Sequence, residues 1–90
     1  MSIMNTHVDT KYELYKQKVI KYDWALEYVP EEYKSYEICE IAVTQNGVAL
    51  QYVPEELRLC EICKIAFQND ENAIEYVPVH EKVNCLLESY

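Results

Sequence analysis

The sequence predicts an all-α fold, a short α-solenoid-like stack of helix pairs with a 24-residue repeat. The first observation is a motif: residues 49–56 read Ala-Leu-Gln-Tyr-Val-Pro-Glu-Glu, and close copies stand at 25–32 and 73–78. The second is the spacing, because Pro30, Pro54 and Pro78 stand at equal intervals that define the repeat length. The third is that apolar residues between the copies recur at helical intervals. Such a period is typical of small units that bury their apolar sides against their neighbours.

The length of 90 residues predicts one small domain. Its first residues show no hydrophobic period, so we expect a flexible N-terminus there. The repeat then divides the remaining chain into a half-repeat that opens the stack, two full units, and a last unit that ends in a more polar cap. The expected ranges are 1–9 for the N-terminus and 10–90 for the repeat domain, divided into 10–22, 23–46, 47–70 and 71–90.

The half-repeat is expected to form one helix that ends at about residue 22. Thr10 followed by Glu13 fits a capping box, in which a hydroxyl and a carboxylate satisfy the unpaired amides of a helix start. Apolar residues then recur at helical spacing. The lysines of this segment give the end of the stack the polar exterior that terminal repeats require.

The first full unit is expected to pair a short helix with a longer one. Asp23 is a plausible N-cap for a short helix over 24–28, which must stop at Pro30 because proline lacks the amide hydrogen. Proline followed by two glutamates suits a new first turn, where carboxylates face the positive end of the helix dipole. A longer helix over about 35–45 follows, with an apolar sector wide enough to be buried against several neighbours.

The second and third units repeat this pattern. Asn46-Gly47 contains the only glycine of the chain, and we expect it to supply a left-handed residue that ends the preceding helix. Short and long helices are expected over about 48–52 and 58–68. The third unit breaks at Pro78 and is expected to finish with a polar helix over about 81–88, which would be the C-terminal cap.

Composition argues against several classes of protein. Sixteen acidic and eight basic side chains give a net charge of −8, the wrong sign for direct binding to nucleic acid. The segment that ends at Tyr22 carries four lysines against two acids, so its net charge is +2 and the repeat body carries −10. No apolar run approaches the roughly 20 residues of a membrane span. The N-terminus does not resemble a signal peptide, so we expect a cytoplasmic protein without a membrane partner.

The four cysteines are expected to be packing residues. Cys39 and Cys63 share one repeat position, and Cys60 takes a position that tyrosine fills in the preceding copies. A position filled by either residue type favours packing, and small thiols are common in protein cores. A metal, redox or disulfide role for these residues or for Cys85 is the alternative interpretation of the Cys-x-x-Cys spacing.

The combined pattern resembles a known repeat family. Ala-Leu-x-Tyr-Val-Pro-Glu-Glu, an apolar helix with Tyr/Cys-Glu-Ile-Cys, and Gln-Asn-Gly before the next copy are similar to short helical repeats catalogued as a domain of unknown function. Such repeats are scattered through bacterial, phage and giant-virus proteins. The resemblance covers about residues 23–78 and implies an all-helical fold. It implies no catalytic residues.

No sequence motif points to an enzyme or to a bound cofactor. One glycine cannot build a phosphate-binding loop, and the chain has neither a nucleophile elbow nor a metal-binding histidine pair. A pair formed by His80 and Cys85 has no third group to orient it. We therefore expect a protein without catalytic residues, cofactor or metal.

Aromatic and acidic side chains are the candidates for contact with a partner. Tyrosine and tryptophan are enriched at interfaces, and those outside the repeated positions are not required by the stack. The repeated Tyr28, Tyr52 and Tyr76 are expected to pack instead. Recurring carboxylates form either a solvated face or a surface that imitates phosphates. The candidate residues are Tyr15, Tyr22, Trp24, Glu31, Glu32, Tyr33, Glu55, Glu56, Glu75 and Tyr90.

Three functional hypotheses follow. The first is a non-catalytic protein-binding repeat that acts as a stoichiometric binder or inhibitor of another protein. The second is an acidic decoy, such as an anti-CRISPR-type phage protein, that mimics nucleic acid and blocks a nucleic-acid-binding complex. The third is a structural module that forms homo-oligomers through an open end of the stack.

Overall fold

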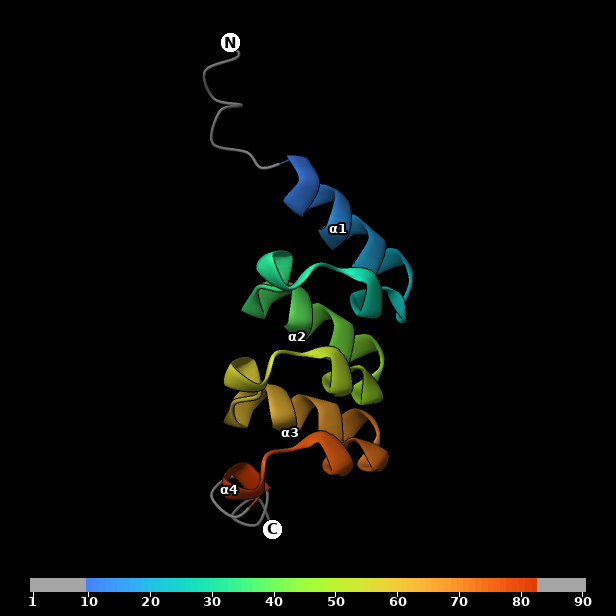
Figure 1. Cartoon of the computed structure of the whole chain (residues 1–90). Helices are drawn as coiled ribbons and strands as arrows, with labels where there is room; N and C mark the ends of the chain where they lie inside the picture. Colours follow the sequence, from blue (N-terminus) through green and yellow to red (C-terminus); the bar gives the residue numbers. More distant parts are fainter. Residues whose placement is uncertain (1–9, 83–90) are drawn as a thin grey trace.

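The computed structural model describes residues 10–82, and throughout this range the regular structure is helical, without a β-strand. The molecule is elongated, with principal extents of 51 × 22 × 19 Å (Figure 1). The all-α prediction is confirmed. The predicted flexible N-terminus, most of the predicted C-terminal helix, and Tyr90 lie outside the described residues.

Longer α-helices alternate with short 3₁₀-helices along the chain. The α-helices are α1 (Thr10–Lys21), α2 (Tyr36–Gln45), α3 (Cys60–Asn69) and the short α4 (Val79–Glu81). The 3₁₀-helices are η2 (Ala25–Tyr28), η3 (Glu31–Tyr33), η4 (Gly47–Tyr52), η5 (Glu55–Leu57) and η6 (Glu71–Tyr76). Over residues 10–82, each helix is too short or too polar to cross a bilayer.

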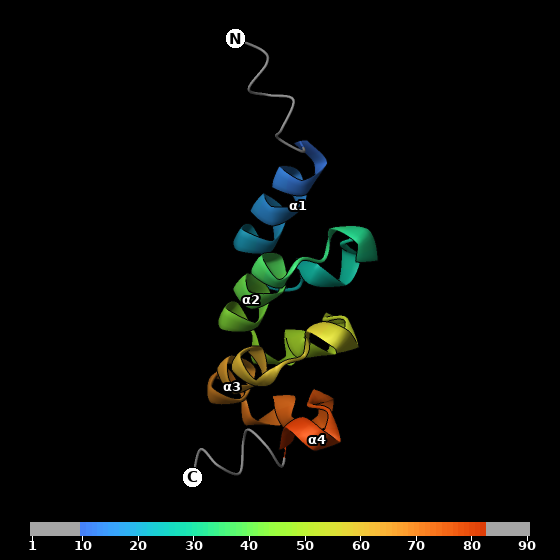
Figure 2. The same cartoon turned by 90° about the vertical axis from the view of Figure 1, so that its left-hand side faces the viewer.

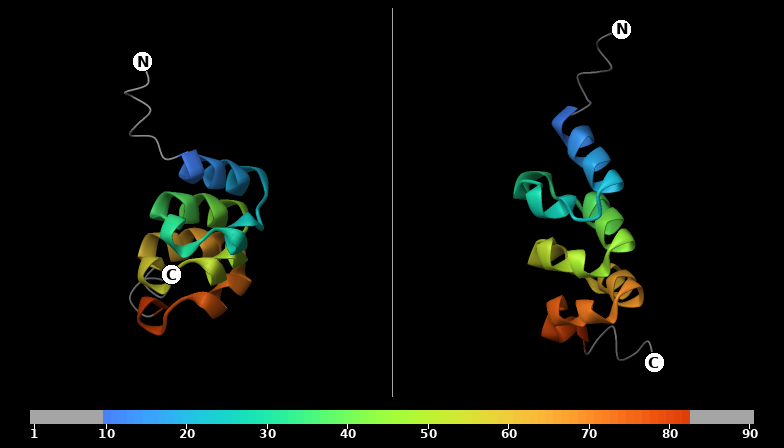
Figure 3. Two further views of the ribbon diagram at one scale, coloured as in Figure 1. Left: turned by 45° about the horizontal axis from the view of Figure 1, so that its top comes forward. Right: turned by 90° about the vertical axis from the view of Figure 1, so that its right-hand side faces the viewer.

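The elements form two parallel rows. α1, α2 and α3 follow one another along the long axis, each packed on the next. Short helices lie beside them, with η2 packed on η4 and η4 on η6 (Figures 2 and 3). η2 and η4 also pack on the α-helix before them and on the one after them, so the rows are joined along their length.

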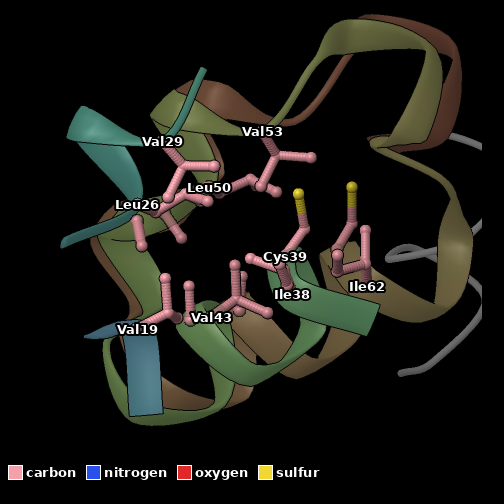
Figure 4. Close-up of a cluster of buried hydrophobic side chains, with 14 of the residues drawn as sticks. Val19, Leu26, Val29, Ile38, Cys39, Val43, Leu50, Val53 and Ile62 are labelled. Atoms are coloured by element: carbon pink, nitrogen blue, oxygen red, sulfur yellow. The ribbon is translucent and has the colours of Figure 1, made fainter. Parts of the chain in front are cut away.

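The core lies between the two rows. Leu26, Ile38, Leu50 and Ile62 are fully buried, and Leu26 and Leu50 come from the short helices while Ile38 and Ile62 come from the α-helices. Figure 4 shows Val29 and Val53, which end short helices, on the opposite side of this cluster from Val19 and Val43. Burial of one such side chain contributes about 1.5–3 kcal/mol. The wide apolar sector predicted for α2 is therefore buried against several neighbouring helices.

The short helices differ from the prediction in type and in capping. They close with hydrogen bonds three residues apart, as from the Val29 amide to the Leu26 carbonyl at 3.1 Å, which suits segments too short for α-helix. Asp23 does not cap η2, because Trp24 takes the N-cap position without a side-chain bond. Thr10, which was predicted to cap the first helix, already lies inside α1.

Gly47 serves close packing and not the left-handed conformation that was predicted. Neither Gly47 nor any other residue from 10 to 82 has a positive φ. A Cβ atom at Gly47 would instead collide with the carbonyl oxygen of Ala66 and press on Asp70. The preceding helix ends through Asn46, whose extended backbone turns the chain while its side chain accepts a hydrogen bond from the Val48 amide.

The cysteines within residues 10–82 divide into two groups, and Cys85 lies outside the described residues. Cys39 and Cys63 are free and fully buried, which confirms their expected packing role. Burial raises the pKa of Cys39 to about 12 and that of Cys63 to about 11. Cys60 packs against the core as expected, but it is also disulfide-bonded, which was the alternative interpretation. Cys60 is only half-buried at the start of α3, where it borders the core without being enclosed by it.

Candidate functional site

An aromatic surface lies where α1 meets η2. The rings of Tyr22 and Trp24 stack with centroids 5.1 Å apart, and Tyr28 meets Trp24 edge-on at 5.8 Å. Trp24 is 54% exposed and Tyr28 is 69% exposed. Large aromatic side chains gain more from burial than most others, so several exposed together make this surface a candidate for contact with a partner.

A tight turn between the two helices presents these rings. The Tyr22 amide donates to the carbonyl oxygen of Lys18 at 2.8 Å, which continues the last turn of α1. The Ala25 amide donates to the carbonyl oxygen of Tyr22 at 3.1 Å and thereby closes the turn. Backbone hydrogen bonds therefore hold both sides of the turn that carries Tyr22 and Trp24.

The rings border a hollow of about 260 Å³. Most of its wall is apolar, and Lys18 supplies a cation at the rim. The ammonium group of Lys21 lies 5.4 Å from the centre of the Tyr22 ring, a cation–π geometry. A second hollow of about 170 Å³ shares Tyr15 and Lys18 with the first. We call the first one the aromatic hollow; it is lined by Tyr15, Lys18, Tyr22, Trp24, Ala25, Tyr28 and Val29.

The hollow exists because this end of the short-helix row has no preceding member among the described residues. One unit later, η2 packs on both α2 and η4 and covers the corresponding surface. The residues there are smaller, and each is buried or half-buried. Cys39, Ala42, Asn46 and Val48 stand one repeat length after Tyr15, Lys18, Tyr22 and Trp24.

A polar network holds α1 on α2 and so fixes one wall of the hollow. The Tyr12 hydroxyl lies 2.7 Å from Ser35 Oγ and donates to Glu37 Oε1, also at 2.7 Å. Lys16 Nζ donates to Glu37 Oε2 at 2.9 Å. This bond to Lys16, followed by the one from Tyr12, lowers the pKa of Glu37, while the carboxylate raises the pKa of Lys16.

Among the aromatic candidates from the sequence, Tyr15, Tyr22 and Trp24 come together in the hollow. Tyr33 lies beside them, because its ring centroid is 5.2 Å from that of Tyr15. Tyr90 is outside the described residues.

The acidic candidates lie elsewhere. Glu31 and Glu32 are exposed on η3, and Glu55 and Glu56 are exposed on η5. η3 and η5 lie on the same side of the molecule, so the two pairs follow one edge (Figure 1). Glu75 is exposed on η6. The pairs are not free of cations, because Lys34 Nζ lies 3.3 Å from Glu31 Oε2.

Sequence reasoning missed Tyr28, which was grouped with Tyr52 and Tyr76 as a packing residue. Tyr52 and Tyr76 are half-buried, and their helices η4 and η6 each pack on the short helix of the preceding unit. Tyr28 belongs to the first short helix of the described residues, and its side chain is exposed. The sequence did contain one signal for this exposure. The half-repeat before η2 has no copy of the motif, so no short helix is predicted there to cover Tyr28.

The described side chains show little that could perform chemistry. Within residues 10–82 no three His, Cys, Asp or Glu side chains are grouped as a metal site. His80 is exposed, with Glu81 beside it at 3.5 Å. The nucleophilic thiols of Cys39 and Cys63 are buried and have raised pKa values, which keeps them protonated near neutral pH.

The fold and this surface define a small helical protein with alternating α- and 3₁₀-helices. Residues 12–58, just over half of the chain, match the family model described as a domain of unknown function, DUF4116, and the chain belongs to that family. This confirms the resemblance found from the repeated motif. Neither the search of curated proteins nor the search of solved structures found a match to the chain.

Proposed function

We propose that this chain is a non-catalytic, protein-binding helical repeat that acts in the cytoplasm as a stoichiometric binder or inhibitor of another protein. Its architecture is proposed to be a short α-solenoid-like stack of 24-residue helix pairs. Proteins of this kind bind partners through surfaces that neighbouring units build together, without a catalytic pocket.

Recurring hydrogen bonds support the repeat architecture. Gln45 Nε2 donates to the carbonyl oxygen of Ile20 at 3.1 Å, which joins the end of α2 to the end of α1. Asn69 Nδ2 donates to the carbonyl oxygen of Thr44 at 3.0 Å, which joins α3 to α2 in the same way. The two donor residues are one repeat length apart in the sequence, and so are the two acceptor residues. The same contact is thus made twice in neighbouring units.

The binding proposal is supported mainly by the exposed rings around the aromatic hollow. Trp24 and Tyr28 expose more than half of their surface although they stand next to a well-packed core. Tryptophan and tyrosine dominate the binding energy of many interfaces, especially around a pocket that the partner can fill. Lys18 in the lining of the hollow and Lys21 beside the Tyr22 ring favour a partner with acidic groups around an apolar anchor.

Capture of partners by variants tests the proposal. Trp24→Ser and Tyr28→Ser should reduce capture of a protein from host lysate at least tenfold, because each removes a ring that a partner would bury. Leu59→Ser is the matched control, since Leu59 is also an exposed apolar residue but lies at the start of α3, away from the hollow. Equal capture by all three variants and the wild type would count against the aromatic hollow as the binding surface.

A second candidate function is an acidic decoy for a nucleic-acid-binding protein. The observation in its favour is the edge on which the glutamate pairs of η3 and η5 follow one another. Binding of this kind should weaken steeply as salt rises and should be competed by DNA or RNA. Replacing Glu31, Glu32, Glu55 and Glu56 by glutamine should abolish it, whereas Trp24→Ser should leave it unchanged. A partner that binds equally well in high salt would exclude this function.

A further inference from the structure

Two equivalent hydrogen bonds join successive units of the short-helix row. Lys34 Nζ donates to the carbonyl oxygen of Tyr52 at 2.8 Å. Arg58 Nη1 donates to the carbonyl oxygen of Tyr76 at 3.0 Å. Both cations stand four residues after a motif proline, and both acceptors are the motif tyrosine of the next unit. A cation of one unit therefore binds the end of the following short helix.

The same spacing gives a third donor and a third acceptor, one at each end of the molecule. Lys82 stands one repeat length after Arg58, and Tyr28 stands one repeat length before Tyr52. Within the described residues, neither the Lys82 ammonium group nor the Tyr28 carbonyl oxygen has a hydrogen-bond partner. One end thus presents the donor of this contact, and the other end presents the matching acceptor.

Exposed apolar side chains are concentrated at the same two ends. Among the large apolar residues exposed in the described part of the chain, only Leu59 lies between the ends. Soluble proteins generally avoid such patches unless a partner covers them. The first end, α1 to η2, exposes Leu14, Ile20, Tyr22, Trp24 and Tyr28, and the second end, η6 to α4, exposes Ile74 and Val79.

The two ends also differ in charge. α1 is basic, and Lys18 stands at the rim of the aromatic hollow. η6 and α4 are acidic through Glu71, Glu75 and Glu81. Opposite charges favour contact between unlike ends and oppose contact between like ends.

We propose that the aromatic hollow is the docking site for η6 and α4 of a second copy of this chain, so that copies associate head to tail. The Lys82 ammonium group of one copy donates to the Tyr28 carbonyl oxygen of the next, and repeats the contacts made by Lys34 and Arg58. The inference rests on one part of the proposed function, that the aromatic hollow is a protein-binding surface, and names a second copy of the chain as its occupant in place of a different protein. A heterologous contact of this kind does not close by itself, so chains of more than two copies are expected at high concentration.

Trp24 gives a direct readout, because it is the only tryptophan of the chain and stands in the hollow. The first experiment measures sedimentation and tryptophan emission of the full chain from low to high concentration. We expect the mass to rise and the emission to shift to shorter wavelength together, as the exposed ring is buried. A monomer with constant emission over the whole range would overturn the inference.

Complementation then tests the direction of the contact. Lys82→Met removes the donor of one end, and Trp24→Ser removes the aromatic anchor of the other. Each variant alone should self-associate at least tenfold more weakly than the wild type. Mixed together, they should form a one-to-one dimer, because the intact hollow of the first variant meets the intact Lys82 of the second. The remaining tryptophan, in the Lys82→Met chain, should shift its emission in the mixture.

Control variants separate this contact from a general loss of charge or fold. Lys82→Arg should associate like the wild type, because Arg58 makes the same bond inside the molecule. Lys64→Met removes a lysine on α3 and should also associate normally. Circular dichroism melting must show that each variant is folded. Association by Lys82→Met equal to that of the wild type would overturn the head-to-tail contact.

The outcomes also separate this inference from the proposed function. If Trp24→Ser abolishes association but the mixture does not dimerise, the hollows of two copies meet each other, and the head-to-tail inference fails. If the wild type stays monomeric while a different protein shifts the Trp24 emission, the binding function stands and the second copy is excluded as its partner. If Trp24 is never covered, by its own chain or by a captured protein, both fail.

Discussion

Arg58 holds the carbonyl oxygen of Tyr76 at 3.0 Å and thereby joins η6 to the preceding unit. Its guanidinium also donates to the carbonyl oxygens of Val53 at 2.8 Å and Gln51 at 3.0 Å. One planar cation thus satisfies acceptors at the ends of two short helices, which a 3₁₀-helix leaves unpaired.

The first prediction is that Arg58→Met lowers the free energy of unfolding by about 2–3 kcal/mol, because hydrogen bonds to a charged group are lost and carbonyl groups remain partly buried. Arg58→Lys should lose less, since Lys34 makes one such bond with an ammonium group. Urea unfolding measures both. Lys64→Met is the control for the loss of a cation, and an equal effect of Lys64→Met would contradict the prediction.

The second prediction concerns Gly47. Gly47→Ala should destabilise the fold by about 1–3 kcal/mol, because the added methyl group meets the backbone carbonyl of Ala66, which cannot move aside as a side chain could. Glu71→Ala is the matched control, since Glu71 takes the same position in the next unit and is exposed. Thermal unfolding of the two variants provides the comparison. A neutral effect of Gly47→Ala would show that α3 can shift away from η4.

The third prediction concerns the two free thiols. Burial raises the pKa of Cys39 from 9.0 to about 12 and that of Cys63 from 9.0 to about 11, so the reactive thiolate is scarce at pH values below 9.0. Both thiols should resist alkylation in the native protein and react fully in denaturant. Mass spectrometry of the alkylated peptides measures this for each residue. Rapid labelling of Cys39 in the folded protein would contradict the prediction, because it would show that the packing around α2 does not exclude the reagent from this thiol.

The fourth prediction is a pH dependence at the contact between α1 and α2. The hydrogen bond to Lys16 lowers the pKa of Glu37 below 4.5, so this carboxylate adds stability above about pH 4.5 that is lost as the pH falls through the lowered pKa. Glu37 raises the pKa of Lys16 above 10.5, so the lysine adds stability below that pH and loses it as the pH rises through the raised value.

Glu37→Gln should therefore lower the melting temperature most at neutral pH, and the difference from the wild type should shrink in acid. Glu61→Gln is the matched control, because Glu61 takes the position of Glu37 in the next unit and is exposed. Melting curves across the pH range measure both variants. A difference that grows in acid would contradict the assignment of Glu37 as the group that is charged in the folded protein.

The repeated motif was sufficient to predict the helical class and most element ends. Pro30 and Pro54 do end η2 and η4, and α2 begins directly after Ser35, as the pattern indicated, whereas the separate short helices η3 and η5 were not predicted. The type of the short helices was not predictable in the same way. Apolar spacing over such short segments does not distinguish α from 3₁₀ geometry, and packing decides between them.

The candidate site was predictable in part, for a physical reason. Tyr15, Tyr22 and Trp24 were singled out because the repeat does not require them, and they do line one hollow. Tyr28 was missed because its position in the motif is the same as that of Tyr52. Its exposure depends on the absence, among the described residues, of a short helix before η2. The repeat position of a residue can be read from the sequence. Its burial depends on whether a neighbouring short helix covers it.

The side-chain amides of Gln45 and Asn69 reach back by about one repeat length each, to the carbonyl oxygens of Ile20 and Thr44. Each of these contacts spans 25 residues, so it can form once two successive helices are in place and does not require the rest of the chain. Folding of this protein is therefore expected to spread from one helix pair to the next.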